Sequence, residues 1–123
     1  MSRLPILIVD DEPLACGMLA RLLSAYGHQV DTAQDGATAL ELVEHNAYGL
    51  AIIDYSMPGM NGVELFRRLR ELRPDLAGIF LTGYTTIDVV YPAIEAGILH
   101  VLPKPADFRE LIAIVQEQVG SAV

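Results

Sequence analysis

Three aspartates in this sequence stand directly after short apolar runs. Asp10 and Asp11 follow residues 6–9, and Asp54 follows residues 50–53. Both runs are continuous rather than alternating, which is typical of strands buried on both faces of a parallel sheet. Ligand sites in such sheets lie outside the carboxyl ends of the strands, so these carboxylates are expected to converge there. A few carboxylates with open positions suit Mg²⁺ better than a full Ca²⁺ cage.

Two further polar groups stand at equivalent places. Thr82 follows the apolar residues 79–81, and Lys104, the only lysine in the chain, follows residues 98–102 and one proline. An ammonium beside a metal ion is repelled unless a more negative group lies between them. A phosphoryl group meets that need, with oxygens facing Mg²⁺, the ammonium and the hydroxyl. An aspartate can itself accept the phosphoryl group as an acyl phosphate.

The elements that must position these groups alternate along the chain. Five apolar runs alternate with stretches in which apolar residues recur at helical spacing. This alternation predicts a doubly wound α/β fold with a five-stranded parallel sheet and five helices. The predicted strands lie at residues 6–9, 29–33, 50–53, 79–81 and 98–102. The predicted helices lie at residues 14–25, 37–45, 63–72, around 86–96, and from Asp107 onward, where Asp107 with Glu110 indicates an N-cap.

The spacing also predicts which helix faces are buried. In the first helix we expect Leu14, Met18 and Leu22 to face the core, and in the last helix we expect Phe108 to do so and Ile114 to lie off the buried stripe.

Pro92 interrupts the fourth helical pattern. A proline inside a helix loses a backbone hydrogen bond and clashes with the carbonyl four residues earlier. We therefore expect a short helix beginning near Pro92 or a kink there, with Val89, Val90 and Tyr91 in irregular structure.

Length and composition limit the function classes. The chain has 123 residues, of which 52% are hydrophobic and 20% charged, as expected for one globular domain over residues 1–123. Its 8 basic and 16 acidic residues give a formal charge of −8, which argues against nucleic-acid binding. One cysteine excludes an internal disulfide, and no apolar run reaches the roughly 20 residues of a membrane span. A cytoplasmic protein without membrane contact is expected.

Four motifs together resemble the receiver domain of two-component response regulators. They are Asp10-Asp11-Glu12-Pro13 after the first strand, residues 54–62 after the third, Thr82-Gly83, and Lys104-Pro105. Each motif alone is weak, but their joint order over about residues 6–119 is specific. The resemblance implies the strand order 2-1-3-4-5.

The resemblance also implies a role for each site residue. Asp54 would be the phosphoacceptor, and Thr82 and Lys104 would contact the phosphoryl group. Mg²⁺ would be bound by Asp11, Asp54 and the backbone carbonyl of Ser56, with Asp10 acting mostly through metal-bound water. The Lys104-Pro105 bond would be cis. Such a domain catalyses its own phosphorylation and dephosphorylation and is otherwise not an enzyme.

The partners follow from the same resemblance. The phosphoryl donor would be a sensor histidine kinase or a phosphotransfer protein. Phosphorylation would change the surface of the fourth helix, fifth strand and fifth helix and so regulate a downstream protein or a fused output domain. No output domain is recognisable within residues 1–123, which leaves both a stand-alone receiver and one cut from a longer regulator or hybrid kinase open.

One position departs from the family pattern. The family often has Tyr or Phe three residues before the lysine as a rotamer switch, and this chain has Val101. Tyr84 or Tyr91 could substitute, and the segment of residues 84–92 is our expected switch.

Three other functions are weighed against this one. A haloacid-dehalogenase-type phosphatase needs a second Asp two positions after its nucleophile, where this chain has Ser56. A flavodoxin-like cofactor site must cradle phosphate in its first loop, and Asp10 and Asp11 would repel it. A pseudo-receiver that only binds partners is disfavoured by the complete set of polar groups.

Overall fold

A five-stranded parallel sheet with helices on both faces forms the protein. The computed structural model describes residues 4–57, 59, 61–83 and 87–120. The strand order is β2-β1-β3-β4-β5, which confirms the predicted fold class and order. The elements, in chain order, are β1 (Ile6–Val9), α1 (Pro13–Ala25), β2 (Val30–Ala33), α2 (Gly36–His45), β3 (Leu50–Asp54), α3 (Gly62–Leu72), β4 (Ala77–Thr82), α4 (Ile87–Glu95), β5 (His100–Pro103) and α5 (Phe108–Val119).

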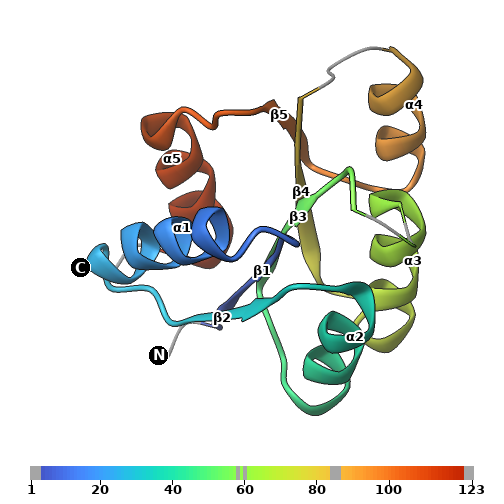
Figure 1. Ribbon diagram of the computed structural model, residues 1–123. Coiled ribbons are helices and arrows are strands. Elements are labelled where there is room, and N and C mark those ends of the chain that lie inside the picture. The colour runs from blue at the N-terminus through green and yellow to red at the C-terminus, as the bar shows by residue number, and fades with distance from the viewer. Residues whose placement is uncertain (1–3, 58, 60, 84–86, 121–123) are drawn as a thin grey trace.

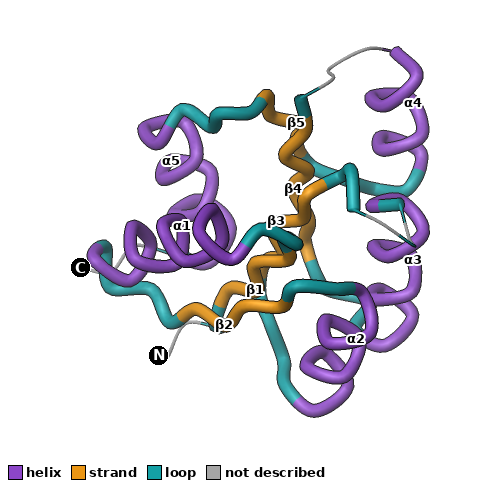
Figure 2. Tube along the Cα trace, in the orientation of Figure 1, coloured by secondary structure: helices purple, strands orange, loops and turns teal. Residues whose placement is uncertain are grey.

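The helices divide into two layers. Helices α1 and α5 lie on one face of the sheet, and α2, α3 and α4 lie on the other (Figures 1 and 2). Successive strand residues point to opposite faces, so Ile6 and Ile8 belong to the core under α1 and α5, while Leu7 and Val9 belong to the core under α2 and α3. Both faces of β1 are therefore buried away from water, which explains its uninterrupted apolar sequence.

The register of the sheet aligns the carboxyl ends of the strands. Val9 lies opposite Ile53, Asp54 opposite Leu81, and Thr82 opposite Pro103. The residues that follow these positions consequently leave the sheet at one edge.

Helix α1 packs with a different face from the one predicted. Its buried residues are Cys16, Leu19 and Leu23, whereas Leu14 and Met18 are 84% and 65% exposed. Apolar residues occur on nearly every side of this helix, so several faces fit a helical period. The tertiary contacts with β1 and β2 select one of them.

The prediction for α5 was correct at its start and wrong in part along its length. The Asp107 carboxylate accepts hydrogen bonds from the Arg109 and Glu110 amides at 2.9 and 3.3 Å, as an N-cap does. Ile114, however, is buried, and Phe108 is half exposed.

Helix α4 runs through Pro92, so the prediction of irregular structure at residues 89–91 was wrong. Pro92 stands in the second turn of the helix, and because it has no N–H it cannot donate a hydrogen bond to the Asp88 carbonyl. The C-terminal turn is closed by hydrogen bonds from the Ala96 amide to the Pro92 carbonyl and from the Ile98 amide to the Ala93 carbonyl, both 3.0 Å long. Tyr84 and the rest of residues 84–86 lie outside the described residues.

A buried tyrosine ties the loop before β3 to the edge strand β2. Tyr48 is buried, and its hydroxyl donates a 2.7 Å hydrogen bond to the Asp31 carboxylate. Burial, together with the bond to and charge of Asp31, raises the pKa of Tyr48 above its ordinary value of 10.0.

We expect Tyr48→Phe to lower the free energy of unfolding by about 1.5–3 kcal/mol, because a hydrogen bond to a charged group is lost. The unfolded chain releases the Tyr48 proton near pH 10.0 and the folded chain holds it, so stability falls as pH rises above 10. Urea unfolding from pH 7 to 11 should show a steeper loss in the native chain than in Tyr48→Phe. Equal slopes would show that Tyr48 ionises normally when folded.

Candidate functional site

Three carboxylates meet at the carboxyl edge of the sheet. Asp10 follows β1 and Asp54 ends β3, and their exposed fractions are 6% and 5%. Asp11 is exposed beside them, and one carboxylate oxygen from each of the three lies within 4.8 Å of the others. These oxygens are hard ligands of the type Mg²⁺ prefers, so the residues fit a metal site open to solvent on the side of Asp11.

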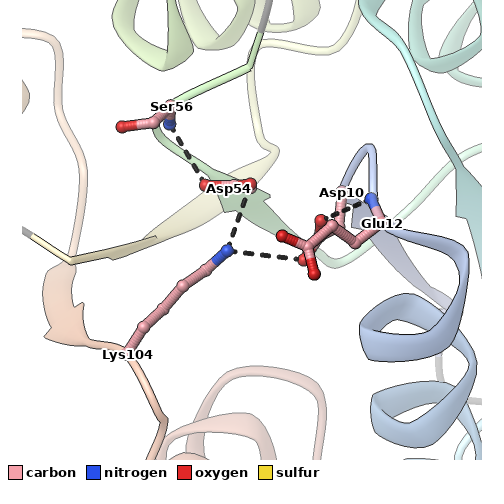
Figure 3. Close-up of polar contacts among 5 residues, drawn as sticks. All are labelled: Asp10, Glu12, Asp54, Ser56 and Lys104. Carbon is pink, nitrogen blue, oxygen red and sulfur yellow. Dashed lines mark hydrogen bonds and ion pairs between the residues drawn. The ribbon is translucent and has the colours of Figure 1, made fainter.

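Lys104 connects two of these carboxylates (Figure 3). Its Nζ lies 3.1 Å from Asp54 Oδ2 and 3.6 Å from Asp10 Oδ2. The Lys104 amide donates a 2.9 Å hydrogen bond to the Thr82 carbonyl, and the Lys104-Pro105 peptide is cis, as expected. The single lysine of the chain is therefore directed into the acidic site rather than into solvent.

Backbone amides fix the orientation of both buried carboxylates. The Glu12 amide donates to Asp10 Oδ1 at 2.9 Å, and the Ser56 amide donates to Asp54 Oδ1 at 3.1 Å. Each aspartate thus has one oxygen bonded to its own loop and one oxygen beside Lys104. This arrangement leaves the two carboxylates with a defined direction before any ligand binds.

The electrostatics show a site with more negative charge than Lys104 neutralises. Burial raises the pKa of Asp54, and the charge of Asp10 adds to this, although the hydrogen bonds from Lys104 and the Ser56 amide act in the opposite direction. Burial lowers the pKa of Lys104, but the hydrogen bond to Asp54 and the charges of Asp54, Asp10 and Glu12 outweigh it, so this pKa is raised. A divalent cation would relieve the excess negative charge.

Thr82 ends β4 at the same edge and is fully buried. Ser56 is exposed on the loop after β3. The structure thus brings Asp10, Asp11, Asp54 and Lys104 into one cluster, with Thr82 on the neighbouring strand. The roles of Thr82 and of the Ser56 carbonyl stay predictions.

A cavity beside the cluster was missed by the sequence analysis. It has a volume of about 430 Å³, and its walls come from α1 and the start of α5 while Asp10, Glu12 and Lys104 reach it from the site. Met18 and Phe108 line it, and their exposure contradicts the predicted burial. The signal that could have found it is the surplus of apolar residues at the starts of these helices.

Comparison with known proteins identifies the family. Residues 6–116 match the response regulator receiver domain, and the chain therefore belongs to this family. It is a signalling module of two-component systems rather than a classical enzyme. Among the described residues, no helix has the length and apolar character needed to cross a membrane.

Curated relatives are longer than this chain. It is 34% identical over 98% of its length to the DNA-binding transcriptional regulator NtrC of Azospirillum brasilense, of which it covers 25%. It is 37% identical over 88% of its length to response regulator MprA of a Mycobacterium species, of which it covers 47%. The chain thus spans a quarter to a half of these relatives.

Solved structures agree with the fold throughout. A CheY-like receiver domain protein from Methanospirillum hungatei has a TM-score of 0.89 and 30% identity, over 94% of this chain and 93% of that one. A response regulator from Burkholderia pseudomallei, solved with a phosphorylated aspartic acid, calcium ion and citrate, has a TM-score of 0.83 and 30% identity, over 89% of this chain and 64% of that one.

Proposed function

We propose that the chain accepts a phosphoryl group on Asp54, with Mg²⁺, from a sensor histidine kinase or a phosphotransfer protein. The observation that carries this proposal is the position of Lys104 Nζ, 3.1 Å from Asp54 Oδ2 and beside a cluster of three carboxylates. A partly buried ammonium and an open metal site on two sides of one carboxylate form a place for a dianionic group bonded to that carboxylate.

In the proposed reaction an Asp54 carboxylate oxygen attacks the phosphorus of a phosphohistidine. The new O–P bond forms as the P–N bond of the donor breaks, and the bonding electrons return to the donor imidazole. Asp11, Asp54 and the Ser56 carbonyl would hold Mg²⁺, with Asp10 acting through bound water. Bound Mg²⁺ would neutralise charge on the transferring phosphoryl oxygens. Lys104 and the Thr82 hydroxyl would bind the remaining oxygens of the aspartyl phosphate.

Direct transfer requires the donor to reach Asp54 from outside. The cavity beside Lys104 is lined by Met18 and Phe108, which are 65% and 50% exposed. Apolar side chains around an acidic opening give a donor protein a surface to pack against. This supports a protein donor in addition to small phosphodonors.

Regulation by the phosphoryl group requires a surface that changes. We propose that α4, β5 and α5 form it and that it contacts a downstream protein or a fused output domain. Val101 replaces the usual aromatic residue of β5 and is only partly buried against the α2–α4 core. Helix α4 begins five residues beyond Thr82 and buries Val89 and Ala93, with Tyr91 and Ile94 exposed. Because residues 87–92 are helical, we propose a shift of the whole of α4 in place of the movement of an irregular switch loop at residues 84–92.

We expect beryllofluoride with Mg²⁺, a phosphoryl mimic, to change amide hydrogen exchange at residues 87–103, because Thr82 moves toward the bound group and α4 follows. Residues 36–45 of α2 serve as the internal control. Changes restricted to residues 10–12 and 54–57 would contradict a role for α4.

Acetyl phosphate with Mg²⁺ tests the function directly. The native chain should gain one phosphoryl group, detected by intact mass, and lose it on incubation. A chain that stays unmodified under these conditions and with phosphohistidine donors would be a pseudo-receiver.

We further propose a cytoplasmic location and no direct nucleic-acid contact by this chain.

A further inference from the structure

The loop after β3 carries the groups on which the proposed metal site depends. Tyr55 lies between Asp54 and Ser56, and two backbone hydrogen bonds hold it. Its amide donates to the Leu81 carbonyl at 2.9 Å, and its carbonyl accepts from the Gly62 amide at 3.2 Å. The first bond continues the sheet beyond β3, and the second bends the chain back toward the start of α3.

The packing around Gly62 leaves no room for a side chain. A Cβ atom there would lie 3.2 Å from Tyr55 Cα, 3.2 Å from Phe80 Cε1 and 3.3 Å from Tyr55 Cδ2. Contacts this short require a neighbour to move by a few tenths of an ångström. The question is therefore which of the two neighbours yields, Phe80 or Tyr55.

Phe80 is held from both sides. Its ring is fully buried, meets the Tyr55 ring edge-on at 5.5 Å between centroids, and meets the Phe66 ring at 6.3 Å. Phe66 is also fully buried, and a side chain at Gly78 would overlap its ring. Close-packed rings over a glycine leave Phe80 no free volume to enter.

The displacement therefore falls on Tyr55. The Tyr55 amide is fixed by the Leu81 carbonyl, whereas the Tyr55 carbonyl is bonded to the amide of Gly62 itself and shifts together with the Gly62 backbone. The part that moves is therefore the peptide between Tyr55 and Ser56. That peptide contains the Ser56 amide, which bonds to Asp54 Oδ1 at 3.1 Å. Ser56 also carries the carbonyl that is the proposed Mg²⁺ ligand.

We propose that Gly62 is a positioning residue for the metal site. Because Gly62 has no side chain, the packed rings of Phe80 and Phe66 determine the position of the Tyr55-Ser56 peptide. That peptide in turn determines the direction of the Asp54 carboxylate. The inference rests on the proposed function, since it concerns the Mg²⁺ of that site.

Gly62→Ala tests this inference. We expect the Mg²⁺ dissociation constant to rise about tenfold, as for loss of groups that orient metal ligands. The measurement is an NMR titration of backbone amides with Mg²⁺, at a temperature where circular dichroism shows every variant folded. Phosphorylation by acetyl phosphate should slow at limiting Mg²⁺ and recover at saturating Mg²⁺.

Gly78→Ala is the matched control. It adds the same methyl group at the far end of the same aromatic wall, where the overlap is greater. It should lower the unfolding temperature more than Gly62→Ala does and change the Mg²⁺ affinity less, because its methyl group meets Phe66 and Ile98 rather than Tyr55. Gly17→Ala, at a helical position where an added Cβ would have nothing within 4 Å, should lower neither the unfolding temperature nor the Mg²⁺ affinity.

A double variant keeps the test decisive. Phe80→Leu removes the ring edge that Gly62→Ala would meet, so adding Gly62→Ala to Phe80→Leu should cost clearly less Mg²⁺ affinity than adding it to the native chain. Three outcomes would overturn the inference. The first is an equal loss of Mg²⁺ affinity on adding Gly62→Ala to the native chain and to Phe80→Leu. The others are an unchanged Mg²⁺ affinity in Gly62→Ala and an equal loss of Mg²⁺ affinity in Gly62→Ala and Gly78→Ala. A native chain that binds no Mg²⁺ would overturn the proposed function as well.

Discussion

Asp54→Asn is expected to abolish phosphorylation and to leave the fold intact. The variant keeps the shape of the side chain and its hydrogen bond from the Ser56 amide. It removes the carboxylate oxygen that attacks phosphorus in the proposed reaction, so no acyl phosphate is expected to form. Incubation with acetyl phosphate and Mg²⁺, followed by intact mass measurement, should show full-length protein without an added phosphoryl group.

The same variant should be as stable as the native chain or more stable when Mg²⁺ is absent. Burial raises the pKa of Asp54, which means that the folded state disfavours its charged form. A carboxyl group with a raised pKa in the folded state lowers stability once pH exceeds its unfolded pKa, so a neutral amide removes that cost at pH 7. Loss of the ion pair with Lys104 acts in the opposite direction and limits the gain.

Asp75→Asn makes the same chemical change at an exposed position. It should be phosphorylated at the native rate. An acid-stable, base-labile phosphoryl group found on Asp54→Asn would falsify the assignment of the acceptor.

Removing the metal should have the second largest effect. We expect chelation of Mg²⁺ to reduce phosphorylation to background, because the charge on the transferring phosphoryl group then meets Asp10, Asp11 and Asp54 with only Lys104 to offset them. Mg²⁺ should also stabilise the fold by mass action, by about 2.7 kcal/mol at one hundred times its dissociation constant. Thermal unfolding with Mg²⁺ and with chelator measures this difference.

Asp11→Ala should remove most of that stabilisation and most of the activity at moderate Mg²⁺. Asp11 is exposed, so its truncation leaves the apo protein as stable as before or slightly more so, because a like charge is lost. Asp75→Ala, at an exposed site away from the cluster, should respond to Mg²⁺ as the native chain does. Identical melting curves with Mg²⁺ and chelator for the native chain would count against the metal site.

Local sequence determined the strands and the edge at which the polar groups meet. The runs at Ile6–Val9 and Leu50–Asp54 are apolar at every position up to the terminal aspartate, and only strands covered on both faces tolerate that pattern. A parallel sheet then has one carboxyl edge, so Asp10 and Asp54 had to approach one another. The Asp107 cap was predictable for a similar reason, since its hydrogen bonds lie within four residues.

Tertiary structure alone decided which face of α1 is buried. Apolar residues surround α1, so its period fits more than one orientation, and contacts with the sheet chose Cys16, Leu19 and Leu23. The exposed Met18 then lines the cavity beside the site. Helix α4 is similar, because burial of Val89 and Ala93 compensates for the hydrogen bond that Pro92 removes.

Side-chain packing at a distance decided the finest features of the site. Lys104 could have been a solvated surface lysine, and the 3.1 Å contact with Asp54 depends on the register of β5 against β4. Gly62 in sequence is only the first residue of a helix, and its lack of space comes from Tyr55 and from Phe80 on another strand. Such constraints join residues far apart in the chain, and sequence spacing carries no record of them because they arise only when separate elements share one volume.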